Sequence, residues 1–150
     1  MSEHIVKRHN KTLLLYHIVC PVKYRKKVFS KIIEKILREI CLEITIRYEV
    51  NFLEIGTDKD HVHFMIQSVP TYSPRDLVQM IKSITAREIF KRNSDIKQDL
   101  WGGHFWTSGY YVNTVGQYGN EEIIRKYVQN QGNNYKQIYR GQLKLFEDLS

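Results

Sequence analysis

Two apolar periodicities alternate along this chain of 150 residues, and their order constrains the fold more than any other feature. Apolar or β-branched runs predict four strands, at residues 12–19, 45–55, 61–69 and 105–114. Apolar residues that recur every three or four positions predict two helices, at residues 25–42 and 73–91. The order strand, helix, strand, strand, helix, strand is the split βαβ pattern. The sequence therefore predicts an α+β, ferredoxin-like or RRM-like βαββαβ fold with an antiparallel sheet.

Residues at the ends of these segments favour the same division. Pro21 closes the first apolar run, and Ser73 and Pro74 stand where an N-cap and a first helical residue belong. A polar stretch at residues 56–60 separates the second and third strands. These two strands are therefore expected to form an antiparallel hairpin.

The last part of the chain predicts two additional helices. Asn120 and the two carboxylates after it open a helical pattern at about residues 120–132. A final helix is expected at about residues 136–149. At this length we expect residues 1–150 to form a single domain.

The composition points toward a polyanionic partner. The net charge is +7, and 12% of the residues are aromatic, with ten tyrosines among them. This balance suits phosphates and unstacked bases, although a soluble protein that is merely basic has the same numbers. The candidates for phosphate contacts lie on the second helix, where an ordinary solvated helix face is the alternative: Lys82, Arg87, Lys91 and Arg92. Trp101, Phe105 and Trp106 are expected to serve in packing or in dimer contacts rather than as base platforms.

Cysteine usage and hydropathy indicate an intracellular globular protein. Cys20 and Cys41 form no Cys-x-x-Cys pair and lie in apolar segments, so both are predicted to be small core residues. No apolar run is long enough to span a bilayer, and the first residues lack the apolar core of a signal peptide. We expect a cytoplasmic protein that does not enter the membrane.

His61 and His63 flank Val62 at the start of an apolar run. Because alternate side chains of a strand share a face, the two imidazoles are expected about 7 Å apart on one side, with Val62 facing the core. Such a pair can form half of a metal site or can be structural. Asp58 and Asp60 precede it and are expected to solvate the turn.

Tyr127 and Gln131 lie one turn apart on the predicted helix at residues 120–132, so they share a face. Gln131 offers an amide oxygen, which is a suitable ligand for a hard cation. The alternative is that Tyr127 belongs to the buried stripe of this helix. Spacing alone does not bring the helix to the histidines.

Four segments, in this order, resemble a known family of enzymes. They are Val22-Lys23-Tyr24-Arg25-Lys26-Lys27-Val28-Phe29, Asp58-Lys59-Asp60-His61-Val62-His63, Leu100-Trp101-Gly102-Gly103-His104-Phe105-Trp106 and Arg125-Lys126-Tyr127-Val128-Gln129-Asn130-Gln131. Together they are similar to the single-tyrosine transposases of small bacterial and archaeal insertion sequences, whose histidine–hydrophobe–histidine motif is called HUH. The resemblance runs from about Leu13 to Gln131.

The resemblance implies a mechanism and residue roles. Tyr127 would be the nucleophile, and His61, His63 and Gln131 would hold a divalent metal ion, Mg²⁺ or Mn²⁺. The implied reaction cleaves and rejoins single-stranded DNA at insertion-sequence ends through a 5′-phosphotyrosine, without a nucleotide cofactor. The implied partners are DNA hairpins and a second subunit, whose tyrosine helix can complete the site of the first.

Two other interpretations are compatible with the same sequence. A domesticated relative would process palindromes with the same chemistry without mobilising its own gene. A non-catalytic RRM-like module would bind RNA, and it should then carry exposed aromatic residues on its central strands.

Overall fold

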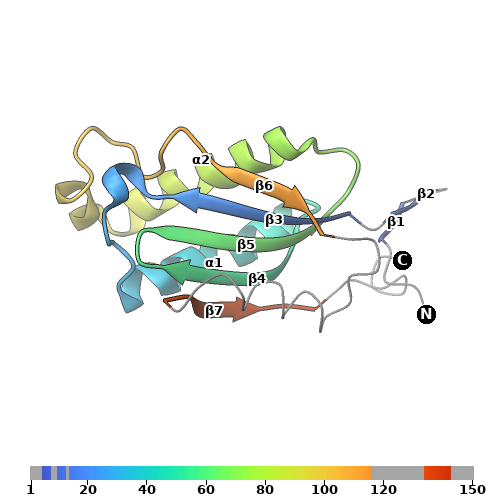
Figure 1. Ribbon diagram of the computed structural model, residues 1–150, viewed down its shortest axis with the longest axis horizontal. Coiled ribbons are helices and arrows are strands. Elements are labelled where there is room, and N and C mark those ends of the chain that lie inside the picture. The colour runs from blue at the N-terminus through green and yellow to red at the C-terminus, as the bar shows by residue number, and fades with distance from the viewer. Residues whose placement is uncertain (1–4, 8–9, 13, 116–133, 143–150) are drawn as a thin grey trace.

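The computed structural model describes residues 5–7, 10–12, 14–115 and 134–142. Its centre is a five-stranded antiparallel sheet in the order β6-β3-β5-β4-β7, with α1 and α2 together on one face (Figure 1). The strands are β3 (Leu14–Pro21), β4 (Asn51–Asp58), β5 (His61–Ser68), β6 (Tyr111–Thr114) and β7 (Lys136–Arg140). The helices are α1 (Lys31–Arg47) and α2 (Pro74–Arg92), with short 3₁₀ turns η1 (Lys23–Arg25) and η2 (Ser94–Gln98). Strands β1 (Ile5–Lys7) and β2 (Asn10–Thr12) form a separate two-stranded ribbon.

The strand order confirms the predicted fold class. Strands β3, β4, β5 and β6 are the four strands of a βαββαβ unit, and β5 lies between β3 and β4 in the sheet. Every pairing is antiparallel, as the split βαβ pattern requires. The sheet thus has one face covered by helices and one face available for a site.

Alternation along β5 separates the two faces as predicted. Val62, Phe64 and Ile66 are buried in the main core beneath α1 and α2. The opposite face carries a smaller apolar cluster around Leu15 and Met65. Cys20 and Cys41 are both free thiols buried in the main core, which confirms their predicted role.

Helix α1 begins and ends later than the sequence pattern indicates. The predicted start at Arg25 is wrong, because that residue has a φ of 51° and Ser30 caps the helix at Ile33 N instead. The predicted strand from residue 45 is also wrong, since α1 continues to Arg47. Thr45 satisfies its hydroxyl on the Cys41 carbonyl within the helix, at 3.3 Å, which lets this β-branched residue remain helical.

The predicted β4–β5 hairpin is present with a tighter turn. Strand β4 extends to Asp58, and the connection is reduced to Lys59 and Asp60, with Lys59 in the left-handed region at φ 47°. Asp58 is therefore paired with His61 across the hairpin. Ser73 caps α2 through Asp76 N, and Pro74 is its first residue, as predicted.

Two predictions for the second half are wrong. The expected strand at 105–114 begins only at Tyr111, because Phe105 and Trp106 turn into the core. Of the expected final helix, residues 136–140 form strand β7, which pairs with the outer edge of β4. That edge offers unpaired backbone groups, and pairing with it overrides the local helical pattern. The predicted helix at 120–132 and residues 143–150 lie outside the described residues.

No helix in the described ranges is long and apolar enough to cross a membrane.

Candidate metal centre on the open face of the sheet

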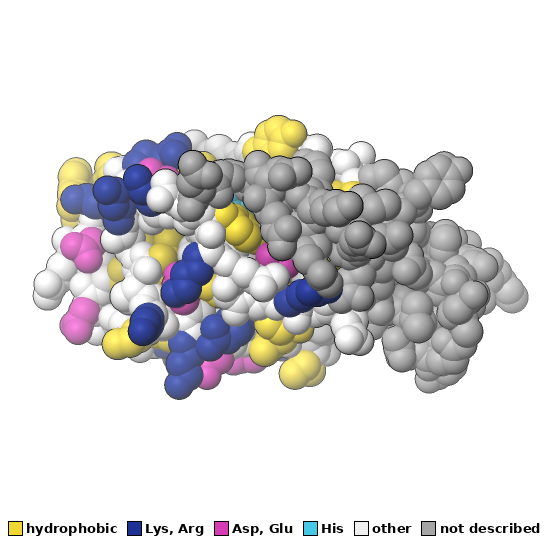
Figure 2. Space-filling view, turned by 60° about the horizontal axis from the view of Figure 1, so that its bottom comes forward, with side chains coloured by type: hydrophobic (Ala, Val, Ile, Leu, Met, Phe, Trp, Pro, Cys, Tyr) yellow, Lys and Arg dark blue, Asp and Glu magenta, His cyan; other side chains and the backbone are white. Residues whose placement is uncertain are grey.

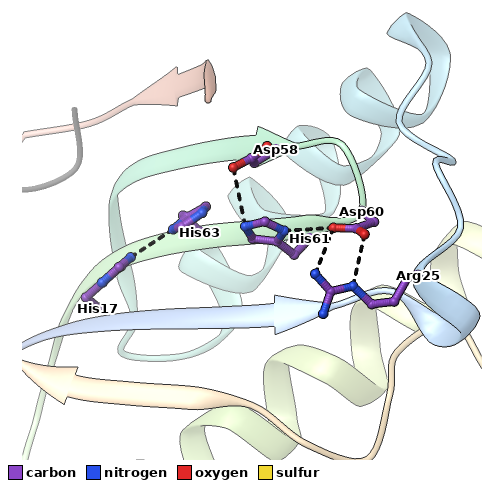
Figure 3. A network of polar contacts seen from close by, with 6 residues as sticks. All are labelled: His17, Arg25, Asp58, Asp60, His61 and His63. Carbon is purple, nitrogen blue, oxygen red and sulfur yellow. Dashed lines mark hydrogen bonds and ion pairs between the residues drawn. The ribbon is translucent and has the colours of Figure 1, made fainter. Parts of the chain in front are cut away.

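The two histidines of β5 lie on the sheet face that the helices do not cover (Figure 3). His61 and His63 are the first and third residues of the strand, and their ring centroids are 4.9 Å apart. His61 is half-buried, whereas His63 is only 4% exposed. The prediction of a shared face is confirmed, and the rings approach more closely than the strand rise alone suggests.

A carboxylate orients His61. Its Nδ1 lies 2.9 Å from Asp60 Oδ1, and Asp60 accepts two hydrogen bonds from Arg25, at 2.9 and 3.2 Å. The hydrogen bonds from the Arg25 guanidinium lower the pKa of Asp60, so this carboxylate is charged. Donation from Nδ1–H to a carboxylate leaves the Nε2 lone pair available, which is the usual support for a metal-bound histidine.

A third histidine supports His63. His17 of β3 places its Nε2 3.1 Å from His63 Nδ1, and the two rings are stacked with centroids 5.3 Å apart. Burial lowers the pKa of His17 to about 4 and that of His63 to about 3. Both rings are therefore neutral at pH 7, and in the contact between them one nitrogen donates its N–H and the other accepts. The sequence analysis does not identify His17 as a site residue. The signal that could have found it is its place on β3, the strand that pairs with β5.

The other nitrogen of His63 lacks a partner. Nε2 is buried and accepts no hydrogen bond from any residue that the structure describes. A buried polar atom left unpaired costs about 1–3 kcal/mol, so a ligand at this position is the simplest explanation. A metal ion needs the lone pair that this nitrogen keeps when Nδ1 donates to His17.

Asp58 completes a donor set with the two histidines. The ligand atoms of Asp58, His61 and His63 all lie within 4.8 Å of one another, and Asp58 Oδ2 is 3.5 Å from His61 Nε2. The expectation that Asp58 only solvates the turn is therefore incomplete, because the hairpin register turns its carboxylate toward the histidines. Two imidazole nitrogens and one carboxylate oxygen fit a divalent cation.

The other predicted site residues, Tyr127 and Gln131, lie outside the described residues, so their roles stay predictions. Tyr135 is described and touches the site: its ring packs against His63 at 5.3 Å, edge to face. Its hydroxyl donates to Glu54 at 2.9 Å. Burial, followed by the charge of Glu54, raises the pKa of Tyr135 well above its usual value, which makes it a poor nucleophile.

The four basic candidates on α2 fall into two groups. Lys82 is buried, and its Nζ donates to backbone carbonyls of residues 107–109, the shortest contact being 2.7 Å to Thr107. Arg92 is held by Glu43 and Glu88, at 2.7 and 3.0 Å. Arg87 and Lys91 are exposed. Because α2 covers the other face of the sheet, none of the four borders the histidines.

Together the fold and the site define a class: a basic α+β protein in which Asp58, His61 and His63, on the sheet face opposite α1 and α2, form a donor set that fits a divalent cation. The family described as transposase IS200 like matches residues 10–131, and the chain belongs to this family. It is thus a transposase, an enzyme that cleaves and transfers DNA.

Individual relatives agree with this assignment. The chain is 30% identical over 118 residues to the ISDra2 transposase TnpA of Deinococcus radiodurans, covering 79% of this chain and 84% of that protein. It is 29% identical over 123 residues to the transposase for insertion sequence element IS200 of Salmonella typhimurium, covering 82% and 80%.

Two solved structures share the fold. A crystal structure described as a transposase of Deinococcus radiodurans superposes with a TM-score of 0.62 at 28% identity, covering 84% of this chain and 96% of that one. A REP-associated tyrosine transposase bound to a REP hairpin superposes with a TM-score of 0.51 at 7% identity, covering 82% and 68%. The second likeness concerns the fold alone.

Proposed function

We propose that this transposase cleaves and rejoins single-stranded DNA at insertion-sequence ends, with Tyr127 as nucleophile and a divalent metal ion, Mg²⁺ or Mn²⁺, as its one cofactor. The observation that carries the proposal is the unpaired, buried Nε2 of His63 beside Asp58 and His61. A structural histidine pair would satisfy both nitrogens of each ring, whereas a metal-binding pair needs one nitrogen of each ring free.

The proposed step is a transesterification at phosphorus. The Tyr127 oxygen forms a bond to phosphorus, its proton passes to solvent, and the 3′-oxygen of the preceding nucleotide leaves as a hydroxyl. The product is a 5′-phosphotyrosine, and attack by another 3′-hydroxyl reverses the step on a new strand. The energy of the phosphodiester stays in the covalent link, so no nucleotide cofactor is required.

The phenol of Tyr127 is a weak nucleophile at neutral pH, so the site must lower the barrier to its attack. A phenol with a pKa of about 10 lies roughly three units from neutral pH, which corresponds to about 4 kcal/mol. A bound cation supplies charge neutralisation at the scissile phosphate. Asp58, His61 and His63 would hold it, with Gln131 as the ligand expected from the tyrosine helix. Asp60 contacts His61 Nδ1 and His17 contacts His63 Nδ1, so each partner fixes the orientation of one imidazole and leaves its Nε2 to face the ion.

The expected partner is a single-stranded DNA hairpin at each end of the element. The hairpin-bound tyrosine transposase of the same fold supports this choice, and so does the net charge of +7. Arg87 and Lys91 remain the better candidates for phosphate contacts, because the cations of Lys82 and Arg92 are engaged within the protein. We further propose a cytoplasmic homodimer in which the tyrosine helix of one subunit can serve the site of the other.

A covalent-adduct assay tests the proposal. A hairpin oligonucleotide with single-stranded flanks is incubated with the protein and Mn²⁺ or Mg²⁺, and the product is resolved under denaturing conditions. The wild type should form a protein–DNA adduct, and Tyr127→Phe should form none, while the matched control Tyr135→Phe should retain it. An adduct that persists in Tyr127→Phe would move the nucleophile to another residue.

The metal ligands are tested separately from binding. His63→Ala should abolish the adduct while hairpin affinity, followed by fluorescence anisotropy, stays within about threefold of the wild type. If hairpin affinity disappeared together with cleavage, the histidines would be structural and the proposed metal site would be wrong.

A further inference from the structure

Two aromatic rings stack on each other at the surface beside the metal centre. Tyr24 and Trp101 have ring centroids 5.2 Å apart and planes inclined by only 20°. Yet Tyr24 is 45% exposed and Trp101 69% exposed, so much of this aromatic surface faces solvent. The sequence predicts packing or dimer contacts for Trp101, Phe105 and Trp106, and of these three only Phe105 and Trp106 are buried in the structure. We call Tyr24 and Trp101 the Tyr24–Trp101 pair.

The backbone holds the pair in place at a conformational cost. Tyr24 has a φ of 60°, a left-handed conformation that is unfavourable for a residue with a bulky side chain. Its neighbour Lys23 donates its N–H to the Phe105 carbonyl at 2.8 Å, which ties η1 to the segment that carries Trp101. After Trp101, Gly102 turns the chain with a φ of 94°, a value that glycine adopts without strain. Strain of this kind persists where the surroundings fix a particular presentation of a side chain.

The pair is joined to the metal centre through short contacts. Val22 N donates to the Asp60 carbonyl at 2.8 Å, and Arg25, the residue after Tyr24, binds the Asp60 carboxylate with two hydrogen bonds. The same carboxylate orients His61. Figure 3 shows this relay from η1 to the histidine. Tyr24 is therefore the chain neighbour of Arg25, the residue that binds the carboxylate orienting His61.

The surroundings of the pair are cationic. Lys23 Nζ lies 5.6 Å from the Tyr24 ring centroid, and Arg25, Lys26 and Lys27 are exposed. Figure 2 shows Lys and Arg side chains beside hydrophobic ones at the left end of the molecule, where η1 lies in Figure 1. An apolar protein partner would not require this ring of positive charge. Flat aromatic surface between cations matches a nucleobase flanked by phosphates.

We propose that the Tyr24–Trp101 pair is a stacking platform for an unpaired nucleobase of the DNA strand that enters the metal centre. The base lies against the exposed face of the pair, and its flanking phosphates lie near Lys23, Lys26 and Lys27. The inference deepens the proposed function and rests on it, since it names a subsite for the same single-stranded substrate. Arg25 would couple the occupied platform to His61 through Asp60.

Tryptophan fluorescence tests the platform directly in the intact protein. The chain contains two tryptophans, and Trp106 is buried, so quenching by added DNA reports on Trp101. The Tyr127→Phe background prevents strand transfer during the measurement. An unstructured single-stranded flank oligonucleotide should quench the emission, and the same oligonucleotide with an abasic position beside the cleavage phosphate should quench it much less. Equal quenching by both, or none by either, would overturn the platform.

Matched substitutions separate stacking from packing. Trp101→Phe retains a flat ring, whereas Trp101→Leu retains apolar volume without one. Base–aromatic stacking predicts that Trp101→Leu lowers affinity for the flank about tenfold, measured by anisotropy at fixed salt, while Trp101→Phe lowers it only about twofold. Equal losses in both variants, or no loss in Trp101→Leu, would refute the stacking role.

The adduct assay distinguishes failure of this inference from failure of the proposed function. If the wild type forms the adduct and Trp101→Leu forms it equally fast at subsaturating DNA, the platform is wrong and the proposed function stands. If the wild type forms no adduct but the flank still quenches Trp101 and the abasic strand does not, the platform stands and the proposed chemistry is wrong. Thermal unfolding of each variant accompanies the assay, and an unchanged melting temperature excludes misfolding as the cause of a loss.

Discussion

Lys82 and Arg87 lie on the same helix, and replacing each with Met should separate a structural cation from a surface one. Lys82 is only 9% exposed, and its Nζ contacts three backbone carbonyls at 2.7, 3.4 and 3.4 Å. Hydrogen bonds to a charged group contribute about 1.5–3 kcal/mol, and the carbonyls would be left without this donor. Arg87 has a side chain that is 64% exposed, and its nearest acidic oxygen is 3.8 Å away, on Glu88.

We therefore expect Lys82→Met to lower the free energy of unfolding by about 2–3 kcal/mol. For a chain of this length, this corresponds to a fall in melting temperature of roughly 4–12 °C. Arg87→Met should change stability by no more than about 0.5 kcal/mol, because no buried contact is lost. Urea titration followed by circular dichroism measures both variants under one set of conditions.

DNA binding should show the opposite order. Hairpin affinity measured at two salt concentrations should fall in Arg87→Met, with a shallower salt dependence, if Arg87 contacts a phosphate. Lys82→Met should keep its hairpin affinity at a temperature where it is folded. A Lys82→Met protein with unchanged stability and reduced hairpin affinity would refute the structural assignment and restore Lys82 as a phosphate contact.

Three further outcomes follow from the site. Asp60→Asn should weaken Mn²⁺ binding about 10–100-fold by calorimetry, because the imidazole that it orients loses its carboxylate partner, and unchanged affinity would contradict this. In EDTA, lowering the pH from 7 to 5 should destabilise the fold by about 2 kcal/mol for each of His17 and His63. Burial lowers the pKa of both residues in the folded state, so the unfolded chain binds protons first as the pH falls. The stability that the two neutral histidines contribute is therefore present above pH 6.5 and is lost as the pH falls toward about 4. Urea titrations at the two pH values measure it, and His17→Gln should lose about half of the effect. Gly56→Ala should lower the melting temperature, since its Cβ would enter a tyrosine ring, whereas Gly109→Ala, with open space around it, should not.

Much of the site was predictable because a strand has a period of two. His61 and His63 had to share a face once the apolar run after them was assigned to a buried strand. Asp58 was not predictable as their neighbour, because its place depends on how many residues form the turn. The sequence suggested a turn of five residues, whereas the structure uses two, and this register brings the carboxylate opposite His61.

The sequence by itself determined the order of strands and helices from β3 to β6, the buried face of β5 and the burial of Cys20 and Cys41. All of these depend on local periodicity and on the free energy of removing apolar side chains from water. The tertiary structure decided which distant groups meet. It placed His17 behind His63 and Lys82 beneath the loop before β6, and it left Trp101 exposed on Tyr24. Contacts between residues far apart in the chain depend on strand pairing and packing, and a local pattern contains no information about them.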